Sequence, residues 1–482
     1  MDEKFVKLQE QAEKWVEAHK EEFITELQGM TRIPSISRAD LAQEGAPFGP
    51  DCRRMLDYAM ERGRHYDFQT MDHEGYAASI CYGDPQDSIG VFAHLDVVPV
   101  GEGWIYPPFE ALYLPEHDAI VGRGCDDNKC AAVGSLFAMR MLREFGYPLK
   151  HGVRLFCGVS EETGMQDMIA LKEKGFQFPK LNLVPDAGFP VNYGQKGSAN
   201  GEISIECSGN LLAFEGGSAT NAVPGTAECV LAMDTEACKD ALQKLDPQLT
   251  SALEVISCEE GTKIRATGKA AHTAKPADGI NAIYLLARAL VEAGLLNGSC
   301  ADVMAQVYEL SGDFTGKNEG VSYGDEMSGD LTLVYAMAEL KEGRLFLKAN
   351  SRTPLTCDVE ILVENLKKEW TKRGFEVVST SFSKPYYVPV DDPHVEALQE
   401  IYRSVTKLDK PPFVMSGGNY ARVIPNAYSF GPGTASGKPI SDFMPQGHGN
   451  CHGADEAVYM EKAHICAITY VLAIGKMDEM LD

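Results

Sequence analysis

Apolar side chains recur at helical spacing in several stretches of the chain. A period of about 3.6 residues predicts helices over residues 129–142, 281–292 and 359–372, and a closing helix over 456–480. The chain also opens with an amphipathic pattern, which predicts one helix over residues 5–30. Its apolar positions are Phe5, Leu8, Ala12, Trp15, Val16, Phe23 and Leu27.

Short apolar runs between these helices predict buried strands. They cover residues 89–94, 153–159 and 181–184. Strands that alternate with helices are typical of an α/β fold with a largely parallel sheet. The pattern changes over residues 192–383, where strands and helices alternate less regularly, and the α/β pattern then resumes. The sequence therefore predicts a discontinuous α/β domain, residues 1–191 and 384–482, interrupted by an α+β domain over 192–383.

Size and charge narrow the classes of function. A chain of 482 residues is longer than one hydrophobic core usually supports, which agrees with two domains. A formal net charge of −26 repels phosphate groups, so we expect neither nucleic acid nor a membrane as a partner. The first residues lack the apolar stretch of a signal peptide, and the apolar stretch 465–474 is too short to span a bilayer. We therefore expect a cytoplasmic protein.

The cysteines point to the same compartment. Thirteen cysteines at irregular spacing predict reduced thiols rather than a disulfide framework. Cys125 and Cys130 have no second pair of cysteines to complete a zinc site, so buried free thiols are the better interpretation.

Histidines and acids gather near the ends of predicted strands. His94 and Asp96 lie two residues apart, so on a strand their side chains share one face. A metal-binding histidine usually has a carboxylate nearby that orients its ring. Further candidates follow other strands or precede helices. They are Asp126, Asp127, Glu161, Glu162 and Asp186, and near the end of the chain His452, Asp455 and Glu456.

Each of these elements alone has a structural explanation. A single histidine after a strand is more often a core or surface residue, and two adjacent glutamates often begin a solvated helix. Their recurrence at the carboxyl ends of several strands favours a common site. Carboxylate oxygens together with imidazole suit zinc, manganese or cobalt. Shared carboxylates can hold two such ions about 3.5–4 Å apart.

Two motifs of known hydrolase classes occur only in part. A serine nucleophile elbow requires glycine two residues after the serine, but Glu162 occupies that position after Ser160. His73 and Glu74 begin like a zincin helix, but Ala77 stands where the second histidine would be. Neither chemistry is expected.

Six motifs, in this order, resemble the M20 metallopeptidase family and within it the PepV-type dipeptidases. They are HLDVVPVGEGW (94–104), GRGCDDNK (122–129), SEETG (160–164), PDAGFP (185–190), GKAAHTAKP (268–276) and CHGADEAV (451–458). The resemblance covers nearly the whole chain. It implies a zinc-peptidase-like catalytic domain with the inserted segment 192–383 as its lid.

The resemblance also implies a binuclear metal site. Its ligands would be His94, Asp127, Glu162, Asp186 and His452. Asp127 rather than Asp126 would bridge both ions, because the family's bridging acid stands two residues before the lysine. Asp96 would orient His94, and Glu161 would act as the general base. Two divalent ions are expected, with Zn²⁺ as the first choice and Mn²⁺ or Co²⁺ as alternatives.

In the lid, the resemblance implies contacts with a small peptide substrate. Asn221 and Arg352 would bind the substrate, and His272 would stabilise the charge that develops on its carbonyl oxygen. The implied reaction is hydrolysis of the amide bond of dipeptides. The long lid and residues 417–422 favour this reading over a deacylase of N-acyl amino acids or a broader aminopeptidase. A catalytically silent relative is disfavoured because Glu161 and every ligand are present. We expect a monomer or a weak homo-oligomer.

Three further positions lie close in sequence to the predicted ligands. Cys130 stands where the family has glycine, which would tighten packing behind the metals or make the site sensitive to oxidation. His448 lies close to His452, but the His-x-x-Asp-Glu pattern selects His452 as the ligand. Cys451 remains open as a soft ligand.

Overall fold

The structure, a computed structural model, describes residues 2–433 and 443–481. Contacts between residues divide the chain into two compact units. Unit 1 comprises Met1–Tyr193, Val388–Phe413 and Gly418–Asp482, and unit 2 comprises Gly194–Tyr387 and Val414–Gly417. The boundaries expected from the sequence lie a few residues away, and nothing in the sequence marks Val414–Gly417 as part of the inserted segment.

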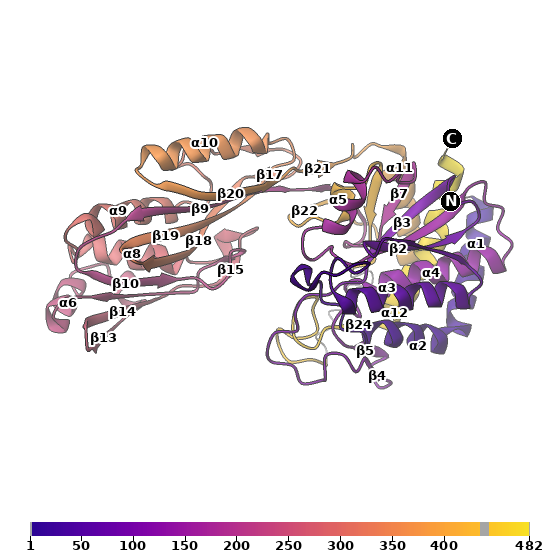
Figure 1. Ribbon diagram of the computed structural model, residues 1–482, viewed down its shortest axis with the longest axis horizontal. Helices are drawn as coiled ribbons and strands as arrows, with labels where there is room; N and C mark the ends of the chain where they lie inside the picture. The colour runs from indigo at the N-terminus through magenta and orange to yellow at the C-terminus, as the bar shows by residue number, and fades with distance from the viewer. Residues whose placement is uncertain (1, 434–442, 482) are drawn as a thin grey trace. The chain divides into compact units, whose positions relative to one another are not determined.

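The main sheet of unit 1 is mixed, with parallel strands at its centre (Figure 1). The strand order is β1 (Gln69–His73), β2 (Ala77–Tyr82), β6 (Gly152–Gly158), β3 (Ser88–His94), β7 (Leu181–Val184), β23 (Ala427–Phe430) and β8 (Val191–Gln195). Strand β8 continues into unit 2, where its last residues pair with β21 (Tyr386–Tyr387), and β22 (Phe413–Met415) also pairs with β8.

The direction of pairing changes from the centre of this sheet to its edges. Strand β3 is parallel to β6 and β7, and β23 is parallel to β7. By contrast, β1, β2 and β6 pair antiparallel, as do β23 and β8. At the β1–β2 edge the reason is a tight connection in which Glu74 and Gly75 adopt φ of 57° and 76°. The predicted α/β fold is confirmed, with parallel pairing limited to four central strands.

Helices surround this sheet and supply much of the core. They are α1 (Glu3–Ala18), α2 (Lys20–Thr31), α3 (Pro50–His65), α4 (Lys129–Glu144), α5 (Gln166–Glu173), α11 (Pro393–Thr406) and α12 (Met460–Met480), with 3-10 turns η1 (Ala39–Leu41) and η3 (Tyr420–Arg422). Helix α4 is buried over most of its length and packs against both α12 and β3. An apolar helix in this position agrees with the predicted helix over residues 129–142.

Two predicted helices differ from the structure. The opening pattern forms two helices that meet at His19, where φ is −111°. The Nδ1 atom of His19 lies 2.8 Å from the carbonyl oxygen of Trp15 and its ring stacks on the Trp15 ring, which together cap the end of α1. The closing helix begins at Met460 rather than at residue 456, because the preceding residues form β24 (Ala457–Tyr459). This strand belongs to a small sheet with β5 (Ala119–Val121) and β4 (Leu112–Leu114).

Unit 2 is an α+β unit around an eight-stranded antiparallel sheet. The strand order is β13 (Leu253–Cys258), β14 (Gly261–Thr267), β12 (Thr226–Leu231), β10 (Leu211–Gly216), β18 (Thr332–Lys341), β19 (Arg344–Thr353), β9 (Gly197–Glu206) and β20 (Glu376–Ser383). Its other elements are α6 (Thr235–Leu242), α7 (Pro247–Ser251), α8 (Ala282–Glu292), α9 (Ser299–Ser311), α10 (Val359–Lys372), η2 (Pro276–Asp278) and the short strand pairs β11 (Ala222–Val223) with β15 (Ala271–His272) and β16 (Gly324–Asp325) with β17 (Gly329–Asp330).

Helices α8 and α10 of unit 2 begin at residues whose side chains cap them. Asn281 accepts hydrogen bonds from the first backbone N–H groups of α8, and Asp358 does the same for α10. Apolar side chains of α8, α9 and α10 join those of the sheet in one hydrophobic core.

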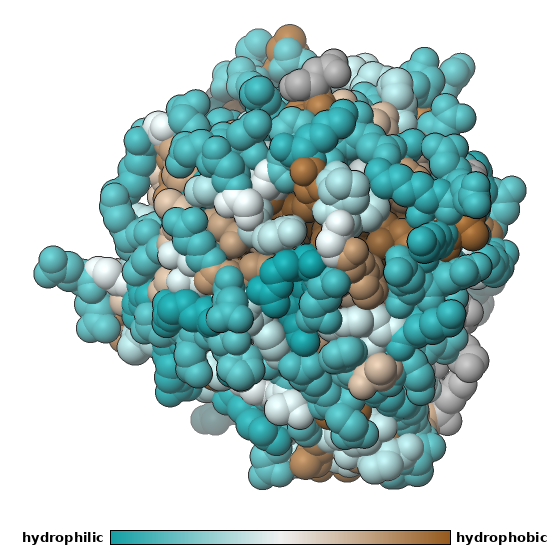
Figure 2. Space-filling view, turned by 90° about the vertical axis from the view of Figure 1, so that its right-hand side faces the viewer, coloured by the Kyte–Doolittle hydropathy of each residue, from teal (hydrophilic) through white to brown (hydrophobic). Residues whose placement is uncertain are grey.

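Polar side chains cover most of the face of the molecule seen in Figure 2, and apolar side chains emerge between them in small groups. This agrees with a chain in which 24% of the residues are charged. Among the described residues, no helix is both long and apolar enough to cross a membrane.

Candidate metal centre

The candidate ligands of unit 1 lie where the central strands end. His94 is the last residue of β3, Asp186 follows β7 by two residues, and Glu162 lies in the turn after β6. Because parallel strands place their carboxyl ends at one edge of the sheet, these three side chains are brought together. Asp127 enters from the turn before α4, and His452 from the loop before β24.

One cluster contains His94, Asp127 and Asp186. The Nε2 atom of His94 lies 3.0 Å from Oδ1 of Asp127 and 3.7 Å from Oδ1 of Asp186. One ligand atom from each residue lies within 4.8 Å of the others, which is close enough for all three to bind one cation. The His94 side chain is only 1% exposed, so its ring is held among packed neighbours.

A second cluster contains Asp127, Glu162 and His452. The Nε2 atom of His452 lies 2.8 Å from Oε1 of Glu162 and 3.2 Å from Oδ2 of Asp127. Their ligand atoms also lie within 4.8 Å of one another. Asp127 therefore directs one oxygen at each histidine. Imidazole and carboxylate donors in two groups that share a carboxylate fit two divalent ions of the zinc, manganese or cobalt kind.

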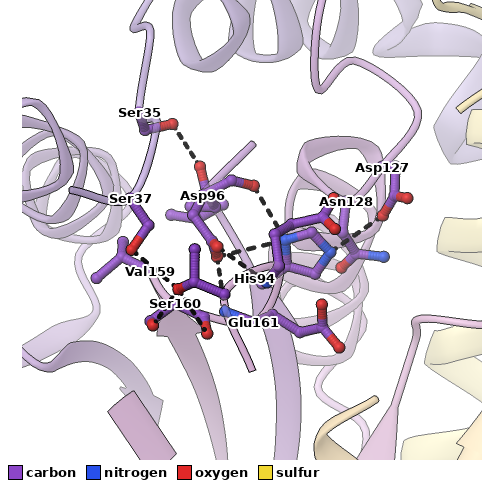
Figure 3. Close-up of polar contacts among 12 residues, drawn as sticks. Ser35, Ser37, His94, Asp96, Asp127, Asn128, Val159, Ser160 and Glu161 are labelled. Carbon is purple, nitrogen blue, oxygen red and sulfur yellow. Dashed lines mark hydrogen bonds and ion pairs between the residues drawn. The ribbon is translucent and has the colours of Figure 1, made fainter. Parts of the chain in front are cut away.

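Asp96 contacts both His94 and the turn after β6. The Nδ1 atom of His94 lies 3.0 Å from the main-chain oxygen of Asp96 and 3.5 Å from its carboxylate oxygen Oδ1, so the main chain makes the shorter contact. The Asp96 carboxylate also accepts hydrogen bonds of 3.1 Å from the backbone N–H groups of Glu161 (Figure 3) and Glu162. Asp96 thus contacts both the first histidine and the turn that carries the two glutamates.

Acidic groups are crowded in this site. Burial raises the pKa of Glu161, and the charge of Asp186 raises it further. Burial also raises the pKa of Asp127, but hydrogen bonds from His452 and His94 outweigh it and hold this pKa well below its usual range. Hydrogen bonds to Asp127 and Glu162 raise the pKa of His452 to about 10. The site therefore favours positive charge, as expected for a place that collects cations.

The neighbours of the ligands have other partners. Asp126 forms an ion pair with Lys462 and accepts a hydrogen bond of 3.2 Å from the thiol of Cys451. The Nδ1 atom of His448 lies 2.6 Å from Oδ2 of Asp455. Asp126, Cys451 and His448 all lie outside both ligand clusters found among the described residues.

Cys125 and Cys130 lie in the core behind the site. Both side chains are fully buried among apolar residues, and burial raises the pKa of both thiols. The Cys125 thiol lies 3.4 Å from the carbonyl oxygens of Ile120 and Glu456. Cys130 therefore fills core volume where the resemblance led us to expect glycine.

Unit 2 brings its three predicted substrate residues into one region. His272 pairs with Ala222 across β15 and β11, and Thr273 donates a hydrogen bond of 3.0 Å to the carbonyl oxygen of Asn221. Arg352 pairs with Thr332 across β19 and β18, and the Thr332 hydroxyl donates to the carbonyl oxygen of Thr273. Segments far apart in sequence thus converge here.

The environments of His272 and Arg352 suit polar recognition. The Nδ1 atom of His272 accepts a hydrogen bond of 3.0 Å from the backbone N–H of Ala274, so a neutral ring carries its proton on Nε2. Burial and the charge of Arg352 lower the pKa of His272, which favours that neutral form. Arg352 is half-buried, and its Nη1 donates a hydrogen bond of 3.4 Å to the carbonyl oxygen of Ser416. Within the described parts of the chain it forms no ion pair with a carboxylate.

Comparison with known proteins identifies the family. A profile of peptidase family M20/M25/M40 matches residues 90–476. This chain belongs to that family. The Bacillus subtilis (strain 168) protein named "Putative dipeptidase YtjP" is 30% identical over 472 residues, which cover 95% of this chain and 97% of that protein.

Several solved structures share the fold of this chain. Human carnosine dipeptidase 1 is 16% identical with a TM-score of 0.54, over 98% of this chain and 100% of that one. The di-peptidase Dug1p from Saccharomyces cerevisiae is 13% identical with a TM-score of 0.56, over 98% of each chain. At these identities the likeness concerns the fold alone.

The structure adds residues that sequence reasoning missed. The Asn419 side chain donates a hydrogen bond of 2.6 Å to the carbonyl oxygen of Asp186. The Tyr420 hydroxyl donates to Asp167, whose carboxylate also accepts from the backbone N–H groups of Val159 and Ser160. In the sequence, residues 417–422 favour dipeptides as substrates. In the structure, Asn419 and Tyr420 of this segment contact residues at or near the ligand-bearing turns. No local pattern signals such distant partners.

Proposed function

We propose that this protein is a binuclear metallopeptidase that hydrolyses the amide bond of dipeptides. The observation that supports it most is the position of Asp127, whose two carboxylate oxygens face two separate groups of ligand candidates. A shared carboxylate is the usual device for holding two ions close together. The family and its dipeptidase members supply the substrate class. Zn²⁺ is the expected metal, with Mn²⁺ and Co²⁺ as alternatives.

In this proposal, some residues of unit 1 bind the metal ions and another transfers the proton. When bound, two divalent ions supply Lewis acidity, which polarises a carbonyl and lowers the pKa of water towards about 7. His94, Asp186, Glu162 and His452 would hold the ions, and Asp127 would offer one carboxylate oxygen to each group of ligands. Glu161 accepts a proton from the attacking water and delivers it to the leaving amine. The hydrogen bond from its backbone N–H to Asp96 fixes the start of this side chain.

The residues of unit 2 bind and orient the substrate. Arg352 can bind a terminal carboxylate through two parallel hydrogen bonds, and its lack of an ion pair among described residues leaves its charge for that purpose. The Nε2–H of His272 is the donor for the carbonyl oxygen as it gains negative charge. Asn221 adds a further polar contact. Capture of a terminal carboxylate limits how long a substrate can be, which favours dipeptides.

The test is a substrate panel combined with metal analysis. Purified protein is stripped with a chelator and reloaded separately with Zn²⁺, Mn²⁺ and Co²⁺, and bound metal is counted. Dipeptides, tripeptides and N-acyl amino acids are then assayed. The proposal expects two ions per chain and kcat/KM that falls steeply from dipeptides to tripeptides. Equal cleavage of longer peptides would favour an aminopeptidase, and preferential turnover of N-acyl amino acids a deacylase. Full metal loading without hydrolysis of any member would favour a silent relative.

Two further expectations stay predictions. They are the cytoplasmic location and the monomeric or weakly associated state.

A further inference from the structure

The turn that carries Asp127 is held by a side chain from a distant part of the chain. The carboxylate of Glu456 accepts hydrogen bonds of 3.0 Å from the backbone N–H groups of Gly124, Asp126 and Asp127. Its main-chain oxygen accepts another, of 2.8 Å, from Gly122. The Glu456 side chain is 1% exposed. A carboxylate buried in this way sets the path of the turn because each N–H would otherwise lack a partner.

Arg123, within the same turn, forms an ion pair with Glu456 and adds further hydrogen bonds to those of the carboxylate. Its Nη1 donates to Oε2 of Glu456 at 2.7 Å, and its own side chain is also 1% exposed. Its Nη2 donates to the carbonyl oxygens of Gly453 at 3.0 Å and His452 at 3.3 Å. The guanidinium therefore joins the backbone of the Asp127 turn to the backbone of the His452 loop.

These contacts converge on one of the two ligand clusters. Asp127 and His452 come from segments 325 residues apart by number, and their side chains lie 3.2 Å from one another. No covalent bond between the two segments fixes that separation. The Arg123–Glu456 pair (the clamp) contacts the backbone of both residues. Neither clamp residue belongs to a ligand cluster found among the described residues, so the pair acts on the site through the backbone of Asp127 and His452.

We propose that Arg123 and Glu456 are positioning residues that hold Asp127 and His452 at a metal-binding separation before any ion binds. This inference rests on the proposed function, since it concerns the same binuclear site. Because Asp127 belongs to both clusters, loosening its turn weakens both ions. Partners that orient metal ligands typically change metal affinity by 10–100-fold when they are removed.

The first test is Glu456→Gln. The amide keeps the size of the side chain but places an NH₂ group against N–H donors, so part of the turn loses its acceptor. Metal dissociation constants are measured by competition with a chromophoric chelator, without any activity assay. We expect both constants to rise 10–100-fold while the circular dichroism spectrum is unchanged.

A matched control separates positioning from general stability. Asp478 is also buried and accepts hydrogen bonds from the backbone N–H groups of Lys150 and His151, away from the ligand clusters. Asp478→Asn removes the same kind of buried acceptor. It is expected to lower the melting temperature and to leave both metal dissociation constants within twofold of the wild type.

A second clamp variant covers the case in which Glu456→Gln does not fold. Arg123→Lys keeps the positive charge next to Glu456 but cannot also reach the carbonyl oxygens of His452 and Gly453. The weaker-bound ion should then lose about 10-fold or more in affinity, as for other orienting partners.

The outcomes separate this inference from the proposed function. Wild-type protein that binds no ions would overturn both. Wild-type protein with two ions, and clamp variants with unchanged affinity, would overturn the clamp alone. An equal loss of affinity in Asp478→Asn would also overturn it, because the effect would then reflect stability in general. Weakened metal binding in the clamp variants, with normal affinity in Asp478→Asn, is the result that supports it.

Discussion

At the scale of single residues, surroundings rather than residue type separate Asp126 from Asp127. Both are aspartates in one turn. Asp127 directs its oxygens at His94 and His452, whereas Asp126 is bound by Lys462 and by a cysteine thiol. A lysine ammonium in contact with a carboxylate satisfies its charge directly. Of the two aspartates, Asp127 is therefore the one whose carboxylate is placed to bind cations.

Substitution of each aspartate tests this difference. Asp127→Asn should abolish activity and weaken both metal sites, because an amide cannot offer an anionic oxygen to each cluster. Asp126→Asn should retain two ions, although breaking its ion pair with Lys462 lowers stability. The measurement is elemental analysis after dialysis against a weak chelator. Two tightly held ions in Asp127→Asn would refute the shared-ligand assignment.

Glu161 and Glu162 are adjacent residues with separable expected roles. Glu161→Gln should keep two ions and the native fold while kcat falls by roughly 10²–10⁴, the usual contribution of a positioned acid–base group. Glu162→Gln is the matched control, since loss of a ligand should reduce metal content instead. Metal content and steady-state kinetics are measured on both variants. Near-normal turnover in Glu161→Gln would show that another group moves the proton.

His272 is expected to act on the transition state rather than on a metal ion. Its hydrogen bond from Ala274 leaves Nε2–H as the donor. His272→Ala should therefore keep full metal content and lower kcat by on the order of 10²–10³, with a smaller change in KM. Kinetics and metal content are measured on the same preparation. Loss of metal would make His272 a ligand, and unchanged kinetics would make it a bystander.

At the scale of secondary structure, the β1–β2–β6 edge joins three strands through a buried polar cluster. The Nε2 atom of His73 on β1 lies 2.9 Å from the hydroxyl of Ser79 on β2 and 3.2 Å from Nη2 of Arg154 on β6. The Arg154 guanidinium also stacks over the ring of Phe156 at 4.5 Å. To accept from Arg154, the His73 ring must be neutral at Nε2.

This cluster predicts a pH dependence of stability. Burial, and to a smaller extent the charge of Arg154, lower the pKa of His73 from 6.5 to about 4, and the charge of Asp72 opposes them only in part. Between these values the unfolded chain binds a proton that the folded chain does not. The contribution is therefore fully present above pH 6.5 and is lost as the pH falls towards 4, by up to about 3 kcal/mol.

Urea unfolding at several pH values measures this effect. His73→Gln should lose less stability than the wild type between pH 6.5 and 4. His65→Gln, at an exposed histidine, is the control and should follow the wild type. The metal ligands titrate in all three proteins, so the difference between curves isolates His73. Identical curves for His73→Gln and the wild type would rule out the assignment.

At the scale of the whole molecule, the two units have separate hydrophobic cores. One core draws its residues from unit 1, among them Leu136 of α4, and the other draws them from unit 2, among them Leu286 of α8. All the candidate metal ligands belong to unit 1. Metal binding should therefore stabilise one unit more than the other, because a ligand stabilises the state that binds it.

Calorimetry with and without a chelator tests this difference. We expect two unfolding transitions, of which only one moves to lower temperature when metal is removed. Leu136→Ala should lower the metal-sensitive transition and Leu286→Ala the other, since each creates a cavity in one fully buried core. A single transition, or two that shift equally with metal, would contradict independent cores.

Much of the fold follows from local sequence patterns. The helix over 359–372 and the strand over 181–184 are predicted at the residues where they form, because apolar periodicity and capping act over neighbouring positions. The break at His19 and the late start of α12 were not predicted. Both depend on contacts that the period does not encode: a ring stacked on Trp15 and a strand paired with β5.

The candidate ligands could be named from sequence because metal chemistry restricts them to a few residue types at strand ends. Their roles remain predictions. The hydrogen bonds that hold these ligands in place could not be predicted from sequence. They join Asp96 to the Glu161 turn, Asn419 to Asp186, and Glu456 to the Asp127 turn. The residue type of a buried carboxylate or amide does not reveal which group it will contact. Its partners here are backbone groups 65, 233 and 329 residues away along the chain, and only the tertiary structure decides which of them it meets.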